Sequence, residues 1–259
     1  MTHISYTRRI AARLCGAAFL ASAAVLAAAA PVPVAAESAP VTVIELFTSQ
    51  GCARCPPADA LLGRLQGEPG IVALSLPVDY WNYLGWTDTR GTPENSARQK
   101  AYAAVRGDRD VFTPQMVING TVAEVGSDEA AVRREIERQR VAGLAPVVPI
   151  GLDRDGDVLQ IRIGAGKPDS GPSMATVWVG AVEARVAATV ANGENAGRDI
   201  VHRNVLRGLR PVGMWKGEAL EIDLPSAEID DGGQRCIVVL LQAERDEKPG
   251  PILGAAFLP

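Results

Sequence analysis

Cysteine and histidine are scarce in this sequence, which has four cysteines and two histidines in 259 residues. A structural zinc site needs four ligands of these types, and a fold held together by disulfides needs several pairs in a short chain. Basic residues are also in the minority, because 26 lysines and arginines stand against 30 acids and give a net charge of −4. A nucleic-acid-binding surface needs an excess of positive charge. The composition therefore argues against a structural zinc site, a disulfide framework and a nucleic-acid partner, and we expect neither a resident metal ion nor a bound cofactor.

The first 36 residues have the three parts of a secretory signal. Three arginines precede an apolar run from Leu14 to Ala30, and small residues follow at positions 34–36. The run is too short and too rich in alanine to be a convincing membrane span. We expect residues 1–36 to be removed on export, which takes away three arginines and no acids and changes the net charge from −4 to −7. The mature protein is expected in the periplasm or outside the cell, without stable membrane association.

Strand and helix patterns alternate between residue 40 and residue 144. Thr92 and Ser127 are expected to cap helices, and Asn119-Gly120 is a strong signal for a tight turn between two antiparallel strands. The first strand, helix and strand form a unit in which the two strands are parallel. This order of elements predicts a thioredoxin-like α/β domain at 40–144. Its elements are expected at 41–47, 57–65, 71–78, 93–106, 112–118, 121–125 and from 127 onward.

Beyond Pro146 the pattern changes to short alternating runs separated by glycine, proline and aspartate. Strands are expected at 147–152, 158–163, 175–182, 185–190, 200–206, 219–224, 235–243 and 252–257. Strands at this spacing, without helices between them, are typical of an antiparallel sandwich. The predicted fold class is therefore an α/β thioredoxin-like N-terminal domain followed by an all-β sandwich-like C-terminal domain at 147–259.

The segment Cys52-Ala53-Arg54-Cys55 lies at the junction between the first strand and its helix. A thiol attacks as its thiolate, and the N–H groups at a helix N-terminus stabilise that charge on Cys52, with Arg54 adding a positive charge nearby. Cys55, one turn on and deeper, is then placed to resolve a mixed disulfide. The same spacing also occurs in half of a metal site and in an inert disulfide. Redox-active thiols are favoured, because only Cys236 and His202 remain in the mature chain to complete a metal site.

Four other residues are candidates for the surroundings of this dithiol. Glu45 lies in a strand that otherwise looks buried, and a carboxylate beneath the dithiol can accept a proton from Cys55; the alternative is a residue at a solvated strand end. The Thr113-Pro114 bond is expected to be cis, which leaves the Thr113 backbone free to pair with an extended substrate. Trp81 forms either one wall of a substrate groove or part of the core.

Five segments of the chain carry a resemblance to a known family. They are Glu45 to Cys52, Cys55 to Asp59, Asp79 to Trp81, Thr113 to Gln115 and Gly193 to Arg198. These segments resemble the bacterial secreted family catalogued as domain of unknown function 1223, and the likeness covers nearly the whole mature chain. The resemblance implies a thioredoxin-like N-terminal domain and a β-rich C-terminal domain, with no established reaction.

Thioredoxins and disulfide-bond proteins show a broader likeness. Cys52 matches their attacking cysteine, Cys55 their resolving cysteine and Pro114 their cis proline. Glu45 falls close to their buried carboxylate, but one residue farther from the dithiol. The segment 126–128 is similar to the one with which glutaredoxins hold glutathione, although it lacks their second glycine. The likeness does not indicate whether the protein oxidises or reduces.

The leading hypothesis is an exported thiol-disulfide oxidoreductase that acts on protein or small-molecule thiols and disulfides. Its expected catalytic residues are Cys52, Cys55, Pro114, Glu45 and Arg54, and its expected substrate-binding residues are Thr113, Trp81, Gly126 and Ser127. A copper-handling protein is one alternative, because soft thiolates suit Cu(I). A non-catalytic interaction module is the other.

Overall fold

A computed structural model of the chain describes Met1 and residues 41–166, 171–229 and 236–259. Apart from Met1, the predicted export signal at 1–36 lies outside the described residues. No helix among the described residues is long and apolar enough to cross a membrane.

The described residues form three α-helices, two short 3₁₀ turns and twelve strands. The helices are α1 (Pro56–Leu65), α2 (Pro93–Arg106) and α3 (Glu129–Val141), the turns are η1 (Asn82–Leu84) and η2 (Ser226–Glu228), and the strands are β1 (Thr42–Thr48), β2 (Ile71–Pro77), β3 (Gln115–Ile118), β4 (Val122–Val125), β5 (Ile150–Asp155), β6 (Val158–Ile163), β7 (Ala175–Thr189), β8 (Asp199–Leu206), β9 (Arg210–Trp215), β10 (Leu220–Pro225), β11 (Cys236–Arg245) and β12 (Lys248–Leu258).

The first half of the chain forms the predicted strand–helix–strand unit and hairpin. β1 and β2 are parallel, while β3 pairs antiparallel with both β1 and β4. The Thr92 side chain caps α2 as predicted, by accepting a hydrogen bond from the Asn95 N–H. The cap of α3 is Asp128, which accepts from the Ala131 N–H, and not the predicted Ser127. Local patterns therefore place these elements correctly to within one to three residues, the largest difference being the start of β3 at Gln115 where 112 was expected.

The predicted fold class is wrong, because the strands of both halves form one sheet. β8 runs parallel beside β2, with Val205 opposite Ser75. In the described part of the chain this gives a nine-stranded mixed sheet in the order β12-β11-β7-β8-β2-β1-β3-β4, with β9 paired to β7. The protein is therefore mostly β, and not an α/β thioredoxin-like domain followed by a separate sandwich. Apolar patterning shows that a strand is buried, but it does not show which strand lies beside it.

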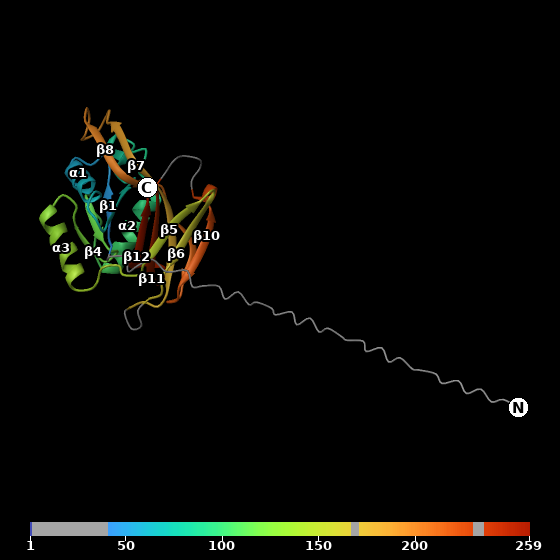
Figure 1. The fold of residues 1–259 in the computed structure, drawn as a ribbon. Coiled ribbons are helices and arrows are strands. Elements are labelled where there is room, and N and C mark those ends of the chain that lie inside the picture. Colours follow the sequence, from blue (N-terminus) through green and yellow to red (C-terminus); the bar gives the residue numbers. More distant parts are fainter. Residues whose placement is uncertain (2–40, 167–170, 230–235) are drawn as a thin grey trace. The chain divides into compact units, whose positions relative to one another are not determined.

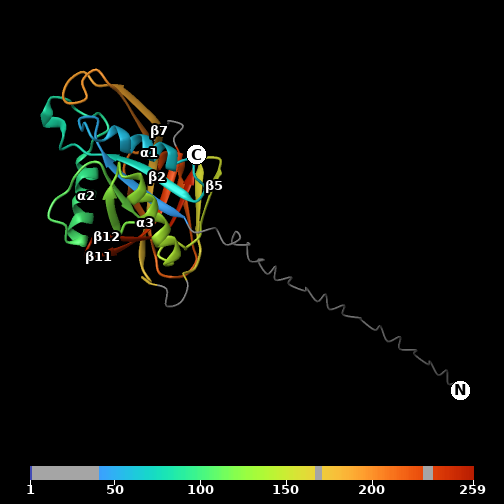
Figure 2. The same ribbon diagram turned by 90° about the vertical axis from the view of Figure 1, so that its left-hand side faces the viewer.

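Helices cover both faces of the sheet in the first half. α1 and α3 pack on the face that carries Ile44 and Leu46, and α2 packs on the face that carries Phe47. The core on the α2 face continues into strands of the second half, including Val182 of β7 and Leu240 of β11. Figure 1 shows α1 and α3 at one side of the molecule and β5, β6 and β10 at the other, and Figure 2 shows the same layers after a quarter turn. One core therefore links the two halves.

A second sheet gives part of the second half a sandwich character. It has three strands in the order β10-β6-β5. Its apolar residues, such as Ile161, pack against Val177 of β7 and Val239 of β11. β7 is a single strand, although two strands with a break at 183–184 were predicted. Glu183 stays within the strand, and its carboxylate forms ion pairs with Arg90 and Arg207. β9 was not predicted.

Asn204 joins β8 to β2. Its φ of +46° lies in the left-handed region, which asparagine tolerates better than most residues. Its side-chain Nδ2 donates a hydrogen bond to the Ala73 C=O at 3.0 Å. The backbone conformation of Asn204 and its hydrogen bond to Ala73 therefore help to fix β8 beside β2, where the two halves of the sheet meet.

The variant Asn204→Val is expected to lower the free energy of unfolding by roughly 2–4 kcal/mol, because a β-branched residue is strained at this φ and the Ala73 carbonyl loses its donor. Urea unfolding of the oxidised protein, followed by tryptophan fluorescence and circular dichroism, measures this effect. Because the halves share a core, wild type and variant should each unfold in one transition. Asn192→Val, at an exposed loop position, is the matched control. Two separate transitions in the wild type would contradict the shared core.

Candidate functional site

Cys52 and Cys55 form a disulfide at the start of α1. α1 begins here because Pro56 fits its first position and the Cys55 carbonyl accepts hydrogen bonds from the N–H groups of Ala58 and Asp59. Cys55 already has helical φ and ψ values of −78° and −34°. Both cysteines are buried, at 1% and 0% exposure. The disulfide thus occupies the expected helix end, but Cys52 is not open to solvent.

The loop between β7 and β8, residues 190–198, covers the disulfide. The Asn195 side-chain Nδ2 donates hydrogen bonds to the carbonyls of Gln50 and Cys52, both at 2.9 Å. The Glu194 carboxylate accepts a hydrogen bond from the Ala53 N–H at 3.2 Å. Asn195 is completely buried by these contacts. Residues of the second half of the chain therefore cover the loop that carries the two cysteines.

The cis proline and its neighbours form another wall of the site. The Thr113–Pro114 peptide bond is cis, as predicted. The Trp81 Nε1–H donates to the Thr113 hydroxyl at 2.7 Å, and the Thr113 backbone makes no hydrogen bond to another described residue. The Gly126 N–H donates to the Pro114 carbonyl at 2.9 Å, and a Cβ at Gly126 would lie 3.3 Å from the Ala58 side chain of α1. Gly126 thus lies between Pro114 and α1, while Trp81 holds Thr113 and lies beside Gly51 of the dithiol loop.

His202 of β8 lies between two buried aspartates. Its Nδ1 is 3.1 Å from Oδ1 of Asp59, which is on α1, and its Nε2 is 3.6 Å from Oδ2 of Asp88, which follows η1. Asp59 Oδ1 also accepts a hydrogen bond from the Thr48 hydroxyl at 3.0 Å, and Asp88 Oδ2 accepts from the Gln50 N–H at 2.8 Å. We call His202, Asp59 and Asp88 the buried triad. It contacts the dithiol loop at Gln50 and the dithiol helix at Asp59.

The two aspartates keep His202 positively charged at neutral pH. Burial alone would lower the pKa of His202, but the carboxylates of Asp59 and Asp88 outweigh it and raise the pKa to about 10. Burial raises the pKa of Asp59, and the hydrogen bonds from His202 and Thr48 oppose this only in part. Burial also acts to raise the pKa of Asp88, but the hydrogen bond from His202, its charge and two backbone N–H groups lower it. The triad therefore holds one imidazolium between two acids of unequal strength.

The family described as a protein of unknown function, DUF1223, matches residues 43–242. The chain belongs to the DUF1223 family. A protein of Agrobacterium tumefaciens with a known crystal structure is 34% identical, with a TM-score of 0.77 over 86% of this chain and 96% of that one. HBP35 of Porphyromonas gingivalis shares the fold at 9% identity, with a TM-score of 0.56 over 84% of this chain and 74% of that one. No curated protein matches the chain.

Glu45 of this DUF1223 protein does not lie beneath the dithiol, which corrects the expectation that it accepts a proton from Cys55. Its side chain is on the α2 face of the sheet, whereas α1 covers the opposite face. One oxygen of Glu45 accepts from Arg98 Nε at 2.7 Å, and the other accepts from the Tyr102 hydroxyl at 2.5 Å. Alternation along β1 brings Glu45 to the side of Phe47 and commits it to a buried ion pair.

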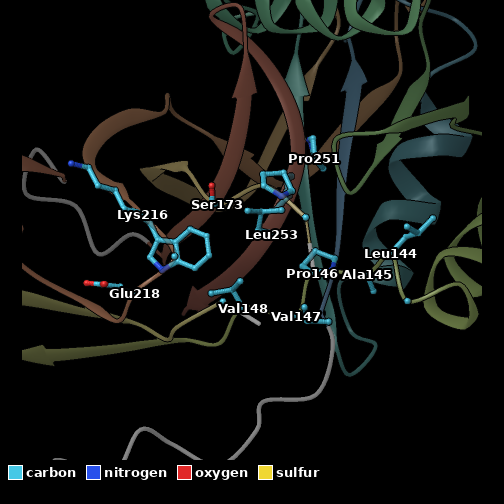
Figure 3. A pocket seen from close by; sticks show the side chains of 17 residues that line it. Leu144, Ala145, Pro146, Val147, Val148, Ser173, Lys216, Glu218, Pro251 and Leu253 are labelled. Carbon is cyan, nitrogen blue, oxygen red and sulfur yellow. The ribbon is translucent and has the colours of Figure 1, made fainter. Parts of the chain in front are cut away.

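Two other predicted residues of the DUF1223 protein lie at the surface. Arg54, between the cysteines, and Ser127, after β4, are both exposed. No group of three or more histidines, cysteines, aspartates and glutamates in the described residues is arranged to hold a metal ion. An apolar cavity of about 530 Å³, lined by residues such as Leu144, Trp215 and Leu253, includes none of the predicted site residues (Figure 3).

The sequence does not reveal the buried triad of the DUF1223 protein. It places His202 in the strand expected at 200–206, and it assigns no role to Asp59 or Asp88. Their separations along the chain follow no motif, because they come from a strand, a helix and a loop. One signal is available in α1: Asp59 is an acid on the buried, otherwise apolar face that also carries Ala58 and Leu62.

Replacing His202 with glutamine is expected to remove an ion pair whose strength depends on pH. The folded state raises the pKa of His202 from 6.5 to about 10, so the imidazolium contributes fully below about pH 6.5 and its contribution is lost as the pH rises toward 10. The free energy of unfolding of the wild type should therefore exceed that of His202→Gln by roughly 3–5 kcal/mol near pH 6, and by much less near pH 10. Urea unfolding of the oxidised proteins across this range measures the difference.

Arg185→Gln is a suitable control, because it removes an exposed positive charge from the neighbouring strand β7. Its difference from wild type should be small and nearly constant with pH. If the difference in free energy of unfolding between wild type and His202→Gln is equally independent of pH, His202 is not charged in the folded state.

Proposed function

We propose that Cys52 and Cys55 form a thiol–disulfide exchange centre that acts on thiols or disulfides of proteins or small molecules. The observation that carries this proposal is the disulfide at the start of α1, where the positive end of the helix dipole favours a thiolate on Cys52. The two cysteines are only three positions apart. Such a short loop restricts the unfolded chain very little, so a purely stabilising role has a weak physical basis.

The exchange reaction balances with the groups that the site supplies. In the reducing direction, the Cys52 thiolate attacks a substrate disulfide, and one substrate sulfur leaves as a thiolate and takes up a proton. Cys55 then loses its proton and attacks Cys52, which releases the second substrate sulfur and closes the protein disulfide. Two electrons pass from the protein to the substrate. The reverse sequence oxidises a substrate dithiol.

The substrate would approach along the wall formed by Thr113, Pro114 and Trp81. The Thr113 backbone has no partner among the described residues, so its N–H and C=O are available to pair with an extended segment. Because Cys52 is buried beneath residues 190–198, this loop has to withdraw before a substrate sulfur reaches it. We further propose that the protein works in the periplasm or outside the cell, where disulfides persist and where the pattern of residues 1–36 would direct it.

The activity is tested with the full mature chain in glutathione buffers of graded ratio. The Cys52–Cys55 disulfide should open and close reversibly in the folded protein, as measured by the mass added on alkylation. The wild type should exchange electrons with a model protein disulfide, and Cys52→Ser should lose this activity completely. Cys236→Ser, which removes the free cysteine of β11, is the matched control and should retain it. A disulfide that opens only on unfolding would refute the proposed function.

Loosening the covering loop is expected to speed reduction of the disulfide. Asn195→Ala removes two buried hydrogen bonds to the dithiol loop, which are together worth about 1–3 kcal/mol. If loop opening limits access, the rate of reduction should rise roughly 5- to 150-fold. Stopped-flow reduction by dithiothreitol measures the rate. Asn192→Ala, at an exposed position of the same loop, should behave as wild type. Equal rates for all three proteins would show that the loop does not limit access.

A further inference from the structure

Asp59 and Cys55 lie on the same face of α1. The Asp59 N–H donates to the Cys55 carbonyl at 3.1 Å, so the two residues are one helical turn apart. Because Cys55 has a helical backbone conformation, side chains at these two positions project in the same direction. Both are buried, at 0% and 4% exposure. Asp59 is therefore the acid that α1 itself brings to the inner cysteine.

One carboxylate oxygen of Asp59 has no hydrogen-bond partner among the described residues. Oδ1 contacts the Thr48 hydroxyl and His202, whereas the buried Oδ2 has no hydrogen-bond partner in the described part of the chain. A buried carboxylate oxygen without a partner carries an energetic cost that protonation relieves. The charged groups that act on Asp59 are His202 of β8 and Asp88 of the loop after η1. The titratable thiol on its own helix is that of Cys55, one turn before it.

Asp59 also lines a cleft that opens between α1 and β8. The cleft has a volume of about 480 Å³, and charged side chains at its edge include Arg64, Asp199 and Arg203. Water in a polar cleft of this size can exchange protons with solvent. Asp59 is therefore the one member of the buried triad that lines this cleft.

We propose that Asp59 accepts the proton of Cys55 when Cys55 resolves a mixed disulfide, and that His202 and Asp88 hold Asp59 in position for this step. The inference rests on the proposed function. The Cys55 S–H proton moves to the Asp59 carboxylate, and the Cys55 sulfur attacks Cys52 and forms the protein disulfide. The substrate sulfur leaves as a thiolate. Asp59 then returns its proton to solvent through the cleft, and in the reverse reaction it donates a proton to the departing Cys55.

The test separates the two sulfur steps of the reduced full-length mature protein. A chromogenic aromatic disulfide, dithiobis-nitrobenzoate, releases one coloured thiolate when Cys52 attacks it and a second when Cys55 resolves the mixed disulfide. Stopped-flow absorbance between about pH 6 and about pH 9 records both phases. Asp59→Asn should slow the second phase by roughly 100-fold or more near pH 7 and leave the first phase within about twofold of wild type.

The pH profile distinguishes proton transfer from a structural effect. Without its acceptor, Cys55 ionises unaided, so the second phase of Asp59→Asn should rise about tenfold per pH unit up to the ordinary thiol pKa of about 8.5 or above. Asp59→Glu should restore a flatter profile. Asp153→Asn makes the same chemical change on exposed strand β5 and should match wild type in both phases. If Asp59→Asn does not fold, the Asp59→Glu and His202→Gln profiles provide the comparison, and His202→Gln should move the second phase to higher pH.

The outcomes for the inference and for the proposed function differ. If the wild type shows neither phase, the exchange function itself fails. If the wild type shows both phases and Asp59→Asn keeps the wild-type pH profile in the second one, Asp59 is not the proton acceptor. A loss of both phases by the same factor at every pH, in a variant with wild-type circular dichroism, would also overturn the inference, because it would indicate a structural role only.

Discussion

The parallel pairing of β8 with β2 is the contact on which the rest of the structure depends. It joins the strands of the two halves in one sheet, and it places His202 beside α1 and residues 190–198 over the disulfide. Without β8, the carboxyl group of Asp59 would lose its positively charged partner His202. The edge of β2 would also be open to unwanted pairing with other chains. The disulfide is thus local in sequence, but its surroundings are assembled by the whole fold.

Two buried polar networks hold the helices to this sheet from opposite faces. On one face, Glu45, Arg98, Tyr102 and Gln242 connect β1, α2 and β11. Burial alone would lower the pKa of Arg98, but Glu45 raises it, so the guanidinium stays charged. On the other face, the buried triad connects α1, β8 and the loop after η1. Networks of this kind have strict geometry, and they fix the position of each helix more precisely than apolar packing does.

Local patterns predict the elements of this protein better than they predict its architecture. The strand–helix–strand unit, the Thr92 cap and the cis bond before Pro114 depend on residues close together in sequence, and all three are found. The sheet that unites the halves depends on the single register pair of Val205 with Ser75, which no periodicity reveals.

The same limit applies to the site. The cysteines, Thr113, Pro114, Trp81 and Gly126 carry recognisable motifs, and the structure brings them together. Glu45 has the right residue type but lies on the wrong face of the sheet. The triad and the covering loop consist of residues that are ordinary in isolation, and their roles arise only from distant contacts.

The contact between Glu194 and the Ala53 N–H has a consequence for communication through the molecule. This carboxylate already occupies the positive end of α1, where a Cys52 thiolate would also be stabilised. Two negative groups that share one region of positive potential repel each other, so an ionised Cys52 weakens the hold of Glu194, and a bound Glu194 disfavours ionisation. Thermodynamic reciprocity makes the two effects equal in size. On the proposed function, reduction of the disulfide would therefore weaken the contact of the Ala53 N–H with Glu194, which lies 141 residues farther along the chain in the loop between β7 and β8.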